Sequence, residues 1–342
     1  MQRIPYDTMR AEFKRVLDAL GFAEPDAATL AQVFADNSCD GVPSHGLNRF
    51  PGFVRAVQAG RVDRDARAHC VASLGAMEQW DGRRGPGVLN ALASMGRAIE
   101  LARTHGLGAV ALRNTSHWMR AGTYGLQAAD AGCIGLCWTN TTPLMPPHGG
   151  TQNRLGNNPL VIGVPAASGE HLLLDMAISQ FSGGRTAIHK RTGEPFPVPG
   201  GYNADGQLTT DAAAIERVLP VGYWKGSGLA LGLDLVAALA SGGQTTAELA
   251  QHQHEAGVSQ LFLAFNLDRL GSREAALAKV DAALADLTSS QSLPGQRVTY
   301  PGQAAAERRR TNRRDGVPVD EHYWQQVIEM PEPTPAPQNT RG

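Results

Sequence analysis

Hydrophobic residues recur at intervals of three and four over long parts of the chain, a pattern typical of helices with one buried face. Met9, Phe13 and Val16 begin the first such stretch, and Gly21 ends it because glycine readily adopts the left-handed conformation that follows a helix. The next helix can open at Pro25, since proline suits a first turn. The pattern predicts helices over 9–20, 25–40, 50–59, 87–104, 226–241 and 275–287, with two more after Pro301 and Pro318.

Short apolar runs lie between several of these helices and predict buried strands over 107–112, 134–138, 160–164, 172–175 and 261–267. Alternation of such strands with helices indicates an α/β fold. Residues 140–150 and 182–207 are dotted with glycine and proline, and we expect extended loops there. The proline-rich stretch 331–342 predicts a disordered tail.

Composition describes a globular chain without a strongly charged partner. Of 342 residues, 42% are hydrophobic and 18% charged, which allows a sizeable core in one large domain or two. The 31 basic and 32 acidic residues give a formal net charge of -1. This balance provides no basic footprint for nucleic acid or an anionic membrane, so neither is expected as a partner.

The cysteines indicate a reducing environment. Cys39, Cys70, Cys133 and Cys137 contain no CxxC pair. Cys133 and Cys137 share a predicted strand, which would hold their Cα atoms about 13 Å apart, too far for a disulfide. The N-terminal residues lack an apolar signal core, and no apolar run is long enough to span a bilayer. We therefore expect free thiols and a cytoplasmic location.

The most chemically informative stretch runs from Ser44 to Arg49 and contains a hydroxyl, an imidazole and a guanidinium. With an ordinary pKa of about 6.5, His45 can give and take a proton near neutral pH. Arg49 offers planar donors that match a carboxylate in a bidentate manner. These groups suit the reduction of a 2-keto acid, although a short polar stretch of this kind is more often a capped turn.

Pro51 leaves two helix starts open. Proline cannot donate a backbone hydrogen bond, and it biases Phe50 away from helical geometry. Either the helix begins near Pro51, or it begins near Ser44 and is kinked. In the second case Ser44 would cap the helix, and His45 and Arg49 would share one face.

Other candidate sites are less specific. The GxGxxG fingerprint of dinucleotide binding is absent, and no histidine pair has zinc-ligand spacing with a third partner, so we expect no metal. His252 and His254 are expected on solvated surface. His117 follows a strand end, where it is either functional or a hydrogen-bonded structural histidine. Residues 223–228 place an aromatic residue and a cation at a helix start, either as a cofactor contact or as an ordinary helix entry.

Taken in order along the chain, several motifs resemble the malate/L-lactate dehydrogenase-like family of NAD(P)-dependent 2-keto acid reductases. The resemblance covers about residues 6–328, and separated matches in order are more specific than any single one. The matching segments are Asp40-Gly41-Val42-Pro43-Ser44-His45-Gly46-Leu47-Asn48-Arg49-Phe50-Pro51, Asn114-Thr115-Ser116-His117-Trp118-Met119-Arg120, Cys137-Trp138-Thr139-Asn140, Met145-Pro146-Pro147, Asn158-Pro159-Leu160, Leu174-Asp175-Met176-Ala177 and Pro220-Val221-Gly222-Tyr223-Trp224-Lys225-Gly226-Ser227-Gly228.

The resemblance implies the α/β malate/L-lactate dehydrogenase-like fold, which is unrelated to the Rossmann fold, and therefore accounts for the missing GxGxxG. We expect a mainly helical domain over 1–125 and 295–330 that carries the proton donor. A cofactor-binding domain with a mixed sheet is expected over 126–294. A homodimer is also implied.

The resemblance also implies roles for individual residues. His45 matches the proton donor, Ser44 would orient it, and His117 matches a position lining the substrate and nicotinamide pocket. Substrate-binding residues would be Arg49, Asn140 and His148. Cofactor-binding residues would be His171, Leu172, Leu173, Leu174, Asp175, Met176 and Ala177, then Trp224 and Lys225, and finally Gly302, Gln303 and Ala304.

Three departures from the family pattern bear on specificity. Gln303 and Ala304 stand where the family commonly has an acidic residue soon after Pro-Gly, which bears on the third cofactor contact. His148 stands where an aromatic residue is frequent, which bears on substrate choice. Asn157 replaces the usual threonine before Asn158.

The expected activity is reduction of a small 2-keto acid, with NADH as cofactor and NADPH as the alternative. Other reactions of the family stay open: oxidation of malate, lactate or ureidoglycolate, or reduction of a cyclic imine acid. A protein that binds a nucleotide or metabolite on the same scaffold without catalysis is the alternative from another class.

Overall fold

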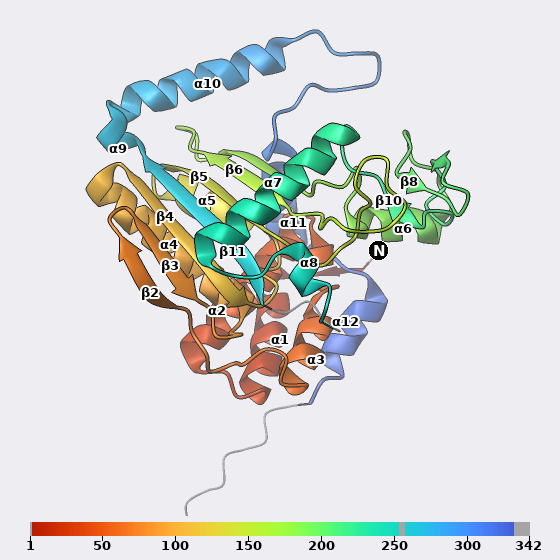
Figure 1. Ribbon diagram of the computed structural model, residues 1–342, viewed down its shortest axis with the longest axis horizontal. Helices are drawn as coiled ribbons and strands as arrows, with labels where there is room; N and C mark the ends of the chain where they lie inside the picture. Colours follow the sequence, from red (N-terminus) through yellow and green to blue (C-terminus); the bar gives the residue numbers. More distant parts are fainter. Residues whose placement is uncertain (1, 253–256, 332–342) are drawn as a thin grey trace, which may run out of the picture. The chain divides into compact units, whose positions relative to one another are not determined.

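The computed structural model describes residues 2–252 and 257–331 (Figure 1). They form two compact units. The first, the helical unit, contains 2–65 and 304–331, and the second, the sheet unit, contains 66–303. His254 and the predicted tail from residue 332 onward lie outside the described residues.

The helical unit is built around phenylalanine side chains from three helices. The Phe50 ring lies 4.4 Å from Phe13 and 5.0 Å from Phe34, centroid to centroid, and all three are fully buried. Burying such rings stabilises a small unit strongly. Its elements are β1 (Arg3–Ile4), α1 (Tyr6–Ala19), α2 (Glu24–Cys39), the 3-10 turn η1 (Pro43–His45), α3 (Phe50–Gln58), α11 (Gln303–Asp315), β12 (Val317–Pro318) and α12 (Glu321–Ile328).

The sheet unit contains a mixed seven-stranded sheet among the described residues. Its order is β2-β3-β4-β11-β5-β6-β7, in which only β3 and β4 pair in parallel. This is not the doubly wound parallel sheet of a Rossmann fold. The strands are β2 (His69–Leu74), β3 (Met77–Asp81), β4 (Leu107–Thr115), β5 (Cys133–Thr139), β6 (Leu160–Val164), β7 (Leu172–Met176) and β11 (Val258–Asn266).

Helices cover the two faces of this sheet, α4 (Gly87–His105) and α5 (Gly122–Asp130) on one and α7 (Trp224–Ser241) on the other (Figure 1). Because side chains alternate along a strand, Leu112 and Phe262 pack beneath α4 and α5, whereas Ala111 and Leu261 pack beneath α7. The remaining helices of this part of the chain are the one-turn helices α8 (Thr246–Leu249) and α9 (Leu267–Leu270) and the 17-residue α10 (Arg273–Ser289), which has no buried residue.

Residues 182–207 are not the extended loop that the sequence predicted. They form α6 (Gly183–Thr192) and β8 (Gly201–Tyr202), and β8 pairs with β9 (Leu208–Thr209) and β10 (Arg217–Val218). A small core of Phe196, Ala212 and Ile215 stabilises this lobe. Its apolar residues are spaced too far apart in sequence for a periodic signal.

The predicted domain boundary also needs correction. Residues 66–125 were expected in the helical domain, but β3 and β4 are integral strands of the sheet. The sequence analysis did not identify β2 or β3, because their half-exposed residues form no apolar run. The main helices and the five predicted strands are confirmed within a few residues of their expected ends.

Candidate active site

The stretch around His45 consists of a 3-10 turn followed by the start of α3. Pro43–His45 forms the turn, and α3 begins at Phe50 with Pro51 in its first turn. Of the two helix starts left open, the one near Pro51 is therefore correct. The backbone of Gly46, with φ -114° and ψ -121°, interrupts any helix from Ser44, so Ser44 does not cap α3.

Ser44 lies in hydrogen-bonding contact with the histidine. Its Oγ is 3.1 Å from His45 Nδ1, and both side chains are half-buried. Proton donation by His45 would then use the other ring nitrogen, Nε2. Arg49 is exposed, and among the described residues its guanidinium has no ion-pair partner. An exposed guanidinium without a carboxylate partner suits the binding of a substrate carboxylate.

The end of α2 packs directly on this loop. The helix ends in a Schellman motif, in which Val42 N donates to Asn37 O at 2.9 Å and Gly41 N to Ser38 O at 3.1 Å. Two side chains of the last turn then reach the loop: Asn37 Nδ2 donates to His45 O at 3.0 Å, and Leu47 N donates to Ser38 Oγ at 2.9 Å. The sequence analysis missed both residues.

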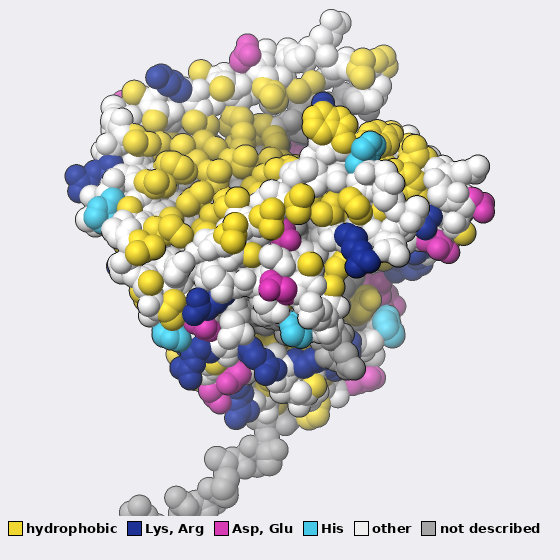
Figure 2. Space-filling view, viewed as in Figure 1, with side chains coloured by type: hydrophobic (Ala, Val, Ile, Leu, Met, Phe, Trp, Pro, Cys, Tyr) yellow, Lys and Arg dark blue, Asp and Glu magenta, His cyan; other side chains and the backbone are white. Residues whose placement is uncertain are grey.

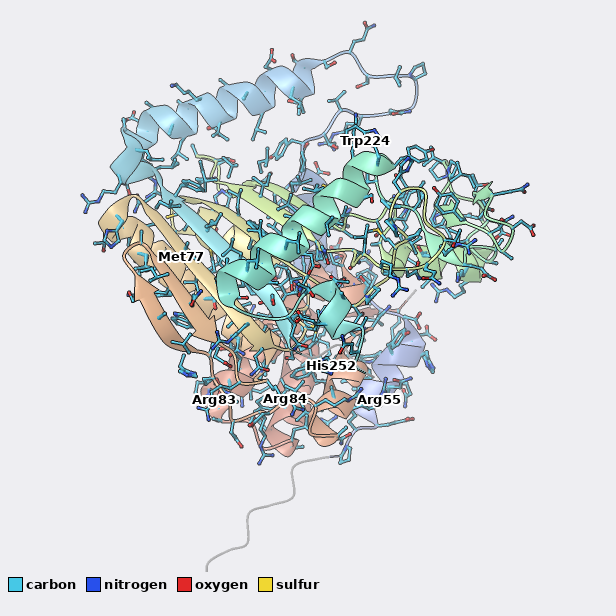
Figure 3. All side chains as sticks on the ribbon, viewed as in Figure 1. Arg55, Met77, Arg83, Arg84, Trp224 and His252 are labelled. Carbon is cyan, nitrogen blue, oxygen red and sulfur yellow. The ribbon has the colours of Figure 1, made fainter. Side chains whose placement is uncertain are left out.

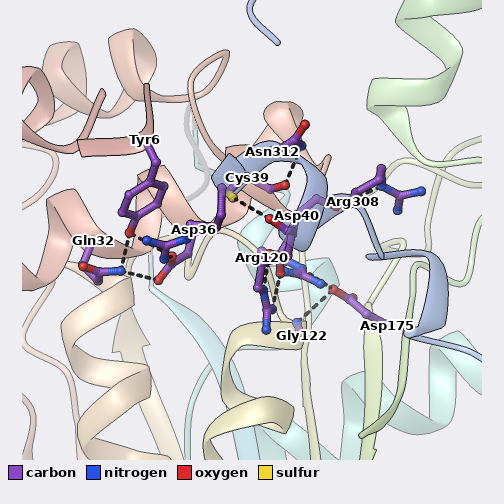
Figure 4. Close-up of polar contacts among 12 residues, drawn as sticks. Tyr6, Gln32, Asp36, Cys39, Asp40, Arg120, Gly122, Asp175, Arg308 and Asn312 are labelled. Atoms are coloured by element: carbon purple, nitrogen blue, oxygen red, sulfur yellow. Dashed lines mark hydrogen bonds and ion pairs between the residues drawn. The ribbon is translucent and has the colours of Figure 1, made fainter. Parts of the chain in front are cut away.

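The helix α11 holds the same end of α2 through other contacts (Figure 4). Arg309 binds the buried Asp40 carboxylate in a bidentate manner at 2.6 and 2.5 Å. Asn312 Nδ2 donates to Cys39 O at 2.7 Å. Asp40 belongs to the motif that carried the family resemblance, and its chemical role here is an ion pair.

In the sheet unit, His117 lies on the loop between β4 and α5. Met119 N donates to His117 Nδ1 at 2.9 Å, and Met119 adopts the left-handed conformation with φ +63°. Since Nδ1 accepts, the neutral ring carries its proton on Nε2. Ser116 Oγ accepts from Gly87 N at 2.8 Å and donates to Gly85 O at 2.9 Å, which fixes the loop on the start of α4.

Asn140 has a supporting role in the structure, whereas the sequence predicted a substrate contact. Its side chain is fully buried: Nδ2 donates to Asp234 Oδ1 at 2.8 Å and to Gln244 O at 2.7 Å. Its Oδ1 accepts from Ser259 N at 2.8 Å. Because both N–H groups are used internally, Asn140 ties β5, β11 and α7 together, and its contact with substrate stays a prediction.

His148 lies beside the first turn of α7. Its backbone N donates to Ser227 Oγ at 3.0 Å. Trp224 is 63% exposed at the beginning of the same helix (Figure 3), and Lys225 beside it is also exposed. The fold thus brings a predicted substrate-binding residue next to a predicted cofactor-binding segment.

Two further predicted cofactor segments meet at β7. Leu173 N donates to Pro301 O at 2.9 Å, although about 130 positions separate them in sequence. A Cβ built on Gly302 would lie 2.9 Å from Leu173 N and 3.0 Å from His171 O, so only glycine fits this approach. The His171 side chain itself is engaged elsewhere: Nε2 contacts Asp130 Oδ1 at 3.0 Å, and Nδ1 accepts from Ala166 N.

Asp175 lies on β7, and its side chain contacts the first residue of α5 (Figure 4). Its Oδ2 accepts from Gly122 N at 2.9 Å and lies 3.7 Å from Arg120 Nε. Loss of hydration raises the pKa of the Asp175 carboxyl, while Arg120 and the Gly122 N–H act in the opposite direction. Oδ1 is left as the oxygen that can accept from a ligand hydroxyl.

These features fit a nicotinamide cofactor. The start of α7 offers an exposed aromatic face, a cation and the positive end of an 18-residue helix, which together suit a base and a pyrophosphate. Gly228, in the same turn, has open space where a Cβ would stand. Of the predicted site residues, Ser44, His45, Arg49 and Ala304 belong to the helical unit and the others to the sheet unit.

Two other classes of site were sought in the described part of the chain. No group of three or more His, Cys, Asp and Glu side chains there could hold a metal ion. No helix among residues 2–252 and 257–331 is both long enough and apolar enough to cross a membrane.

Known proteins resemble this chain over nearly its whole length. A model of the malate/L-lactate dehydrogenase family matches residues 4–328. The 2,3-diketo-L-gulonate reductase of Citrobacter koseri is 42% identical over 332 residues, covering 95% of this chain and 99% of that relative. The reductase of the same name from Salmonella paratyphi A is also 42% identical, over 330 residues and with the same coverage.

Solved structures agree with this similarity. Malate dehydrogenase from Entamoeba histolytica superposes with a TM-score of 0.90 at 23% identity, covering 96% of this chain and 97% of that one, and thus shows the fold. Sulfolactate dehydrogenase from Methanocaldococcus jannaschii has a TM-score of 0.87 at 29% identity, covering 96% of both chains. Delta1-piperideine-2-carboxylate reductase from Pseudomonas syringae pvar. tomato has a TM-score of 0.85 at 25% identity, covering 97% of this chain and 100% of that one.

Proposed function

The chain belongs to the malate/L-lactate dehydrogenase family of oxidoreductases, and from this premise we propose that it reduces 2,3-diketo-L-gulonate to 3-dehydro-L-gulonate. The observation that carries the proposal is the Ser44–His45 contact on a loop that also presents the exposed Arg49. Relatives that bear the name of this reductase are 42% identical over almost the full chain. Residues 117–120 and 222–228 also look most like that reductase.

His45 acts as the acid. As an imidazolium it gives the proton at Nε2 to the oxygen of the 2-keto group and becomes neutral imidazole, so that no unneutralised alkoxide forms. Ser44 holds Nδ1 and thereby the plane of the ring. In the reverse direction the neutral imidazole accepts the proton of the hydroxyl group.

Arg49 binds the substrate carboxylate through two parallel N–H groups. Holding the carboxylate fixes the neighbouring keto carbon, and such positioning can supply several kcal/mol of the rate enhancement. His117, oriented by Met119 N, offers an Nε2–H donor for a second substrate oxygen. His148 replaces the aromatic residue that is frequent at this position in the family, and it would add a polar group to the substrate-binding part of the site.

A nicotinamide cofactor, when bound, supplies the hydride. Trp224 and Lys225 would hold its base and phosphates, and the backbone of 171–177 and 302–304 would provide further contacts. We propose NADH as the preferred form, because the Asp175 carboxylate would accept from a ribose hydroxyl and would repel a phosphate at the same position. Gln303 folds back on its own turn, where its Oε1 accepts from Tyr300 N at 3.4 Å.

The exposed face of α7 supports a homodimer. A helix that is apolar all round is normally buried, yet α7 packs on the sheet on one side only. Its outer side exposes Leu229, Leu235, Val236 and Leu239, the last of them 78% exposed. Figure 2 shows apolar side chains gathered over α7 and the sheet beside it.

The helix α10 presents a second apolar stripe near this face. None of its residues, all of which are described, is buried. Leu277, Val280, Leu284 and Leu287 recur at intervals of three and four, the spacing of a helix that packs on another helix. An uncharged surface of this kind fits a second copy of the same chain.

The four cysteines are free thiols, which supports a cytoplasmic location.

A light-scattering measurement tests the dimer. Leu239→Glu should place a charge in the contact and give monomers at concentrations where the wild type is dimeric. Leu293→Glu, at another exposed leucine, serves as the control. A monomeric wild type would overturn the proposal.

One assay tests the activity. The consumption of NADH and of NADPH is followed with a panel of 2-keto acids that includes 2,3-diketo-L-gulonate, pyruvate, oxaloacetate and a cyclic imine acid. We expect the highest kcat/KM with 2,3-diketo-L-gulonate and NADH. A higher value with another acid would assign a related reaction, and cofactor binding without turnover would indicate a binding protein.

A further inference from the structure

The last turn of α2 contacts the loop on both sides of the proton donor. We propose that Asn37 and Ser38 are positioning residues for His45, acting through the loop backbone and not through contact with substrate. This inference rests on the proposed function, because it presumes that His45 is the acid. Neither residue belongs to the Ser44–Arg49 motif.

Asn37 holds the backbone carbonyl of His45. Its side chain is 1% exposed, and its Nδ2 donates to His45 O at 3.0 Å. The backbone carbonyl of the same residue accepts from Val42 N at 2.9 Å. One residue thus holds the loop three positions before His45 and again at His45 itself.

Ser38 fixes the chain just after the histidine. Its side chain is 3% exposed; its Oγ accepts from Leu47 N at 2.9 Å and donates to Phe34 O at 2.9 Å. The hydroxyl therefore donates its proton within the helix and accepts from the loop. Removing it would leave the buried Leu47 N–H without this acceptor, which is costly.

Because Gly46 has no side chain, the loop can lie close against the last turns of α2. A Cβ built on Gly46 would lie 2.2 Å from Ser38 Oγ, 2.7 Å from Ser38 N and 2.9 Å from Phe34 O. The loop thus lies directly against the α2 backbone, with no space for a side chain. Beyond it, Leu47 and Phe50 are buried, so that His45 lies between two anchored points.

This arrangement matters for a proton donor in particular. Proton transfer needs hydrogen-bonding distance and alignment, and a misplacement of about 1 Å can cost roughly a hundredfold in rate. Ser44 orients the ring only relative to its own backbone, so the backbone must itself be fixed. Arg49 follows Gly46 and precedes α3, so loss of the Asn37 contact should affect substrate binding less than proton transfer.

The test compares Asn37→Ala with Asn312→Ala. Asn312 is 4% exposed and likewise donates its Nδ2 to a backbone carbonyl of the same region, Cys39 O at 2.7 Å, but it does not contact the loop of His45. The two variants should lose similar thermal stability. We expect Asn37→Ala to lower kcat roughly tenfold to a hundredfold, with little change in KM and a larger solvent deuterium isotope effect, while Asn312→Ala keeps both kinetic values.

A double-mutant cycle with His45→Ala separates positioning from general structural damage. If Asn37 acts through His45, adding Asn37→Ala to His45→Ala should not lower the residual rate further. Equal kinetic losses in Asn37→Ala and Asn312→Ala, or a full additive loss in the double variant, would overturn the inference.

Two controls keep the outcomes distinct. Should Asn37→Ala fail to fold, Ser38→Ala is measured by the same criteria, with Ser38→Thr expected to restore part of the rate because it keeps the hydroxyl. Wild-type turnover in His45→Ala would refute the proposed function itself. An inactive His45→Ala with an unaffected Asn37→Ala and Ser38→Ala would refute only the positioning role.

Discussion

The loop of residues 43–49 and the cofactor segments of the sheet unit are built in opposite ways. The loop carries its reactive groups within one short stretch, and neighbouring α2 fixes it by hydrogen bonds. The predicted cofactor segments come from β7, the start of α7 and residues 301–303. Leu173 N donates to Pro301 O, and just after β7 Ile178 O accepts from Val221 N, shortly before α7 begins. The loop therefore depends on a few neighbouring side chains, whereas the predicted cofactor surface depends on backbone approach together with side chains from several segments.

This difference predicts that proton donation and cofactor binding, the two parts of the proposed reaction, respond differently to substitution. Proton donation needs one imidazole at one position, so we expect single substitutions in the loop to be severe. In the proposed site, cofactor binding would be shared among several segments, so we expect a single substitution there to weaken affinity only partly. Four substitutions test this contrast.

His45→Ala should have the largest effect. Loss of the acid should lower kcat by roughly 10² to 10⁴, the usual share of general acid catalysis. Steady-state assays with saturating substrate measure it, with His105→Ala, at an exposed position of α4, as the control. Comparable rates in the two variants would remove the loop from the mechanism.

Arg49→Lys should have the second largest effect. An ammonium group cannot make the two parallel hydrogen bonds of a guanidinium, and losing one bond to a charged group costs roughly 1.5–3 kcal/mol. We expect the KM for the 2-keto acid to rise about tenfold or more, with the KM for the cofactor unchanged. Arg55→Lys, at an exposed position of α3, is the matched control. A change confined to the cofactor KM would contradict the assignment.

Gly302→Ala tests the cofactor surface. Gly302 has φ +98°, and its added methyl group would press on Leu173 N and His171 O. Gly295→Ala introduces a left-handed alanine at φ +72° with nothing within 4 Å, so it controls for backbone strain alone. Titration of cofactor fluorescence should show about tenfold weaker binding for Gly302→Ala only, because a shift of 1.4 kcal/mol is tenfold. Equal affinities would mean that residues 301–303 do not contact the cofactor.

Asp175→Asn should have the smallest effect, on the pH dependence of stability. Loss of hydration at the carboxyl raises the folded-state pKa of Asp175, so the folded protein binds more protons than the unfolded chain between the ordinary Asp pKa and the raised value. This carboxyl therefore makes the wild type lose stability as pH rises through that window. The Tm of Asp175→Asn relative to wild type should increase over the same window. A relative Tm that decreases instead would show that the interactions with Arg120 and the Gly122 N–H outweigh the loss of hydration.

Local signals in the sequence located most helices and several strands. Gly21 and Gly41 end α1 and α2 in the left-handed conformation, as glycine does after a helix. The run 160–164 became β6 with unchanged bounds. Pro51 left two starts open for α3, and the structure shows the start near Pro51, which suits a proline in the first turn.

The roles of residues whose partners are distant in sequence could not be predicted from local signals. Asn140 was expected to bind substrate, but Asp234, Gln244 and Ser259 occupy its amide. His171 is likewise engaged by Asp130 and Ala166. Conversely, Asn37 and Ser38 carry no motif, and only their contacts with the loop identify them.

The sequence by itself determined the chemistry of the Ser44–Arg49 stretch and the family, because reactive groups and helix ends are encoded by neighbouring residues. Only the tertiary structure decided that residues 66–125 belong to the sheet unit, that residues 182–207 form α6 and β8 of a small lobe with β9 and β10, and that Pro301 pairs with β7. Strand pairing joins segments far apart in sequence, and it depends on how complementary surfaces meet rather than on any local pattern.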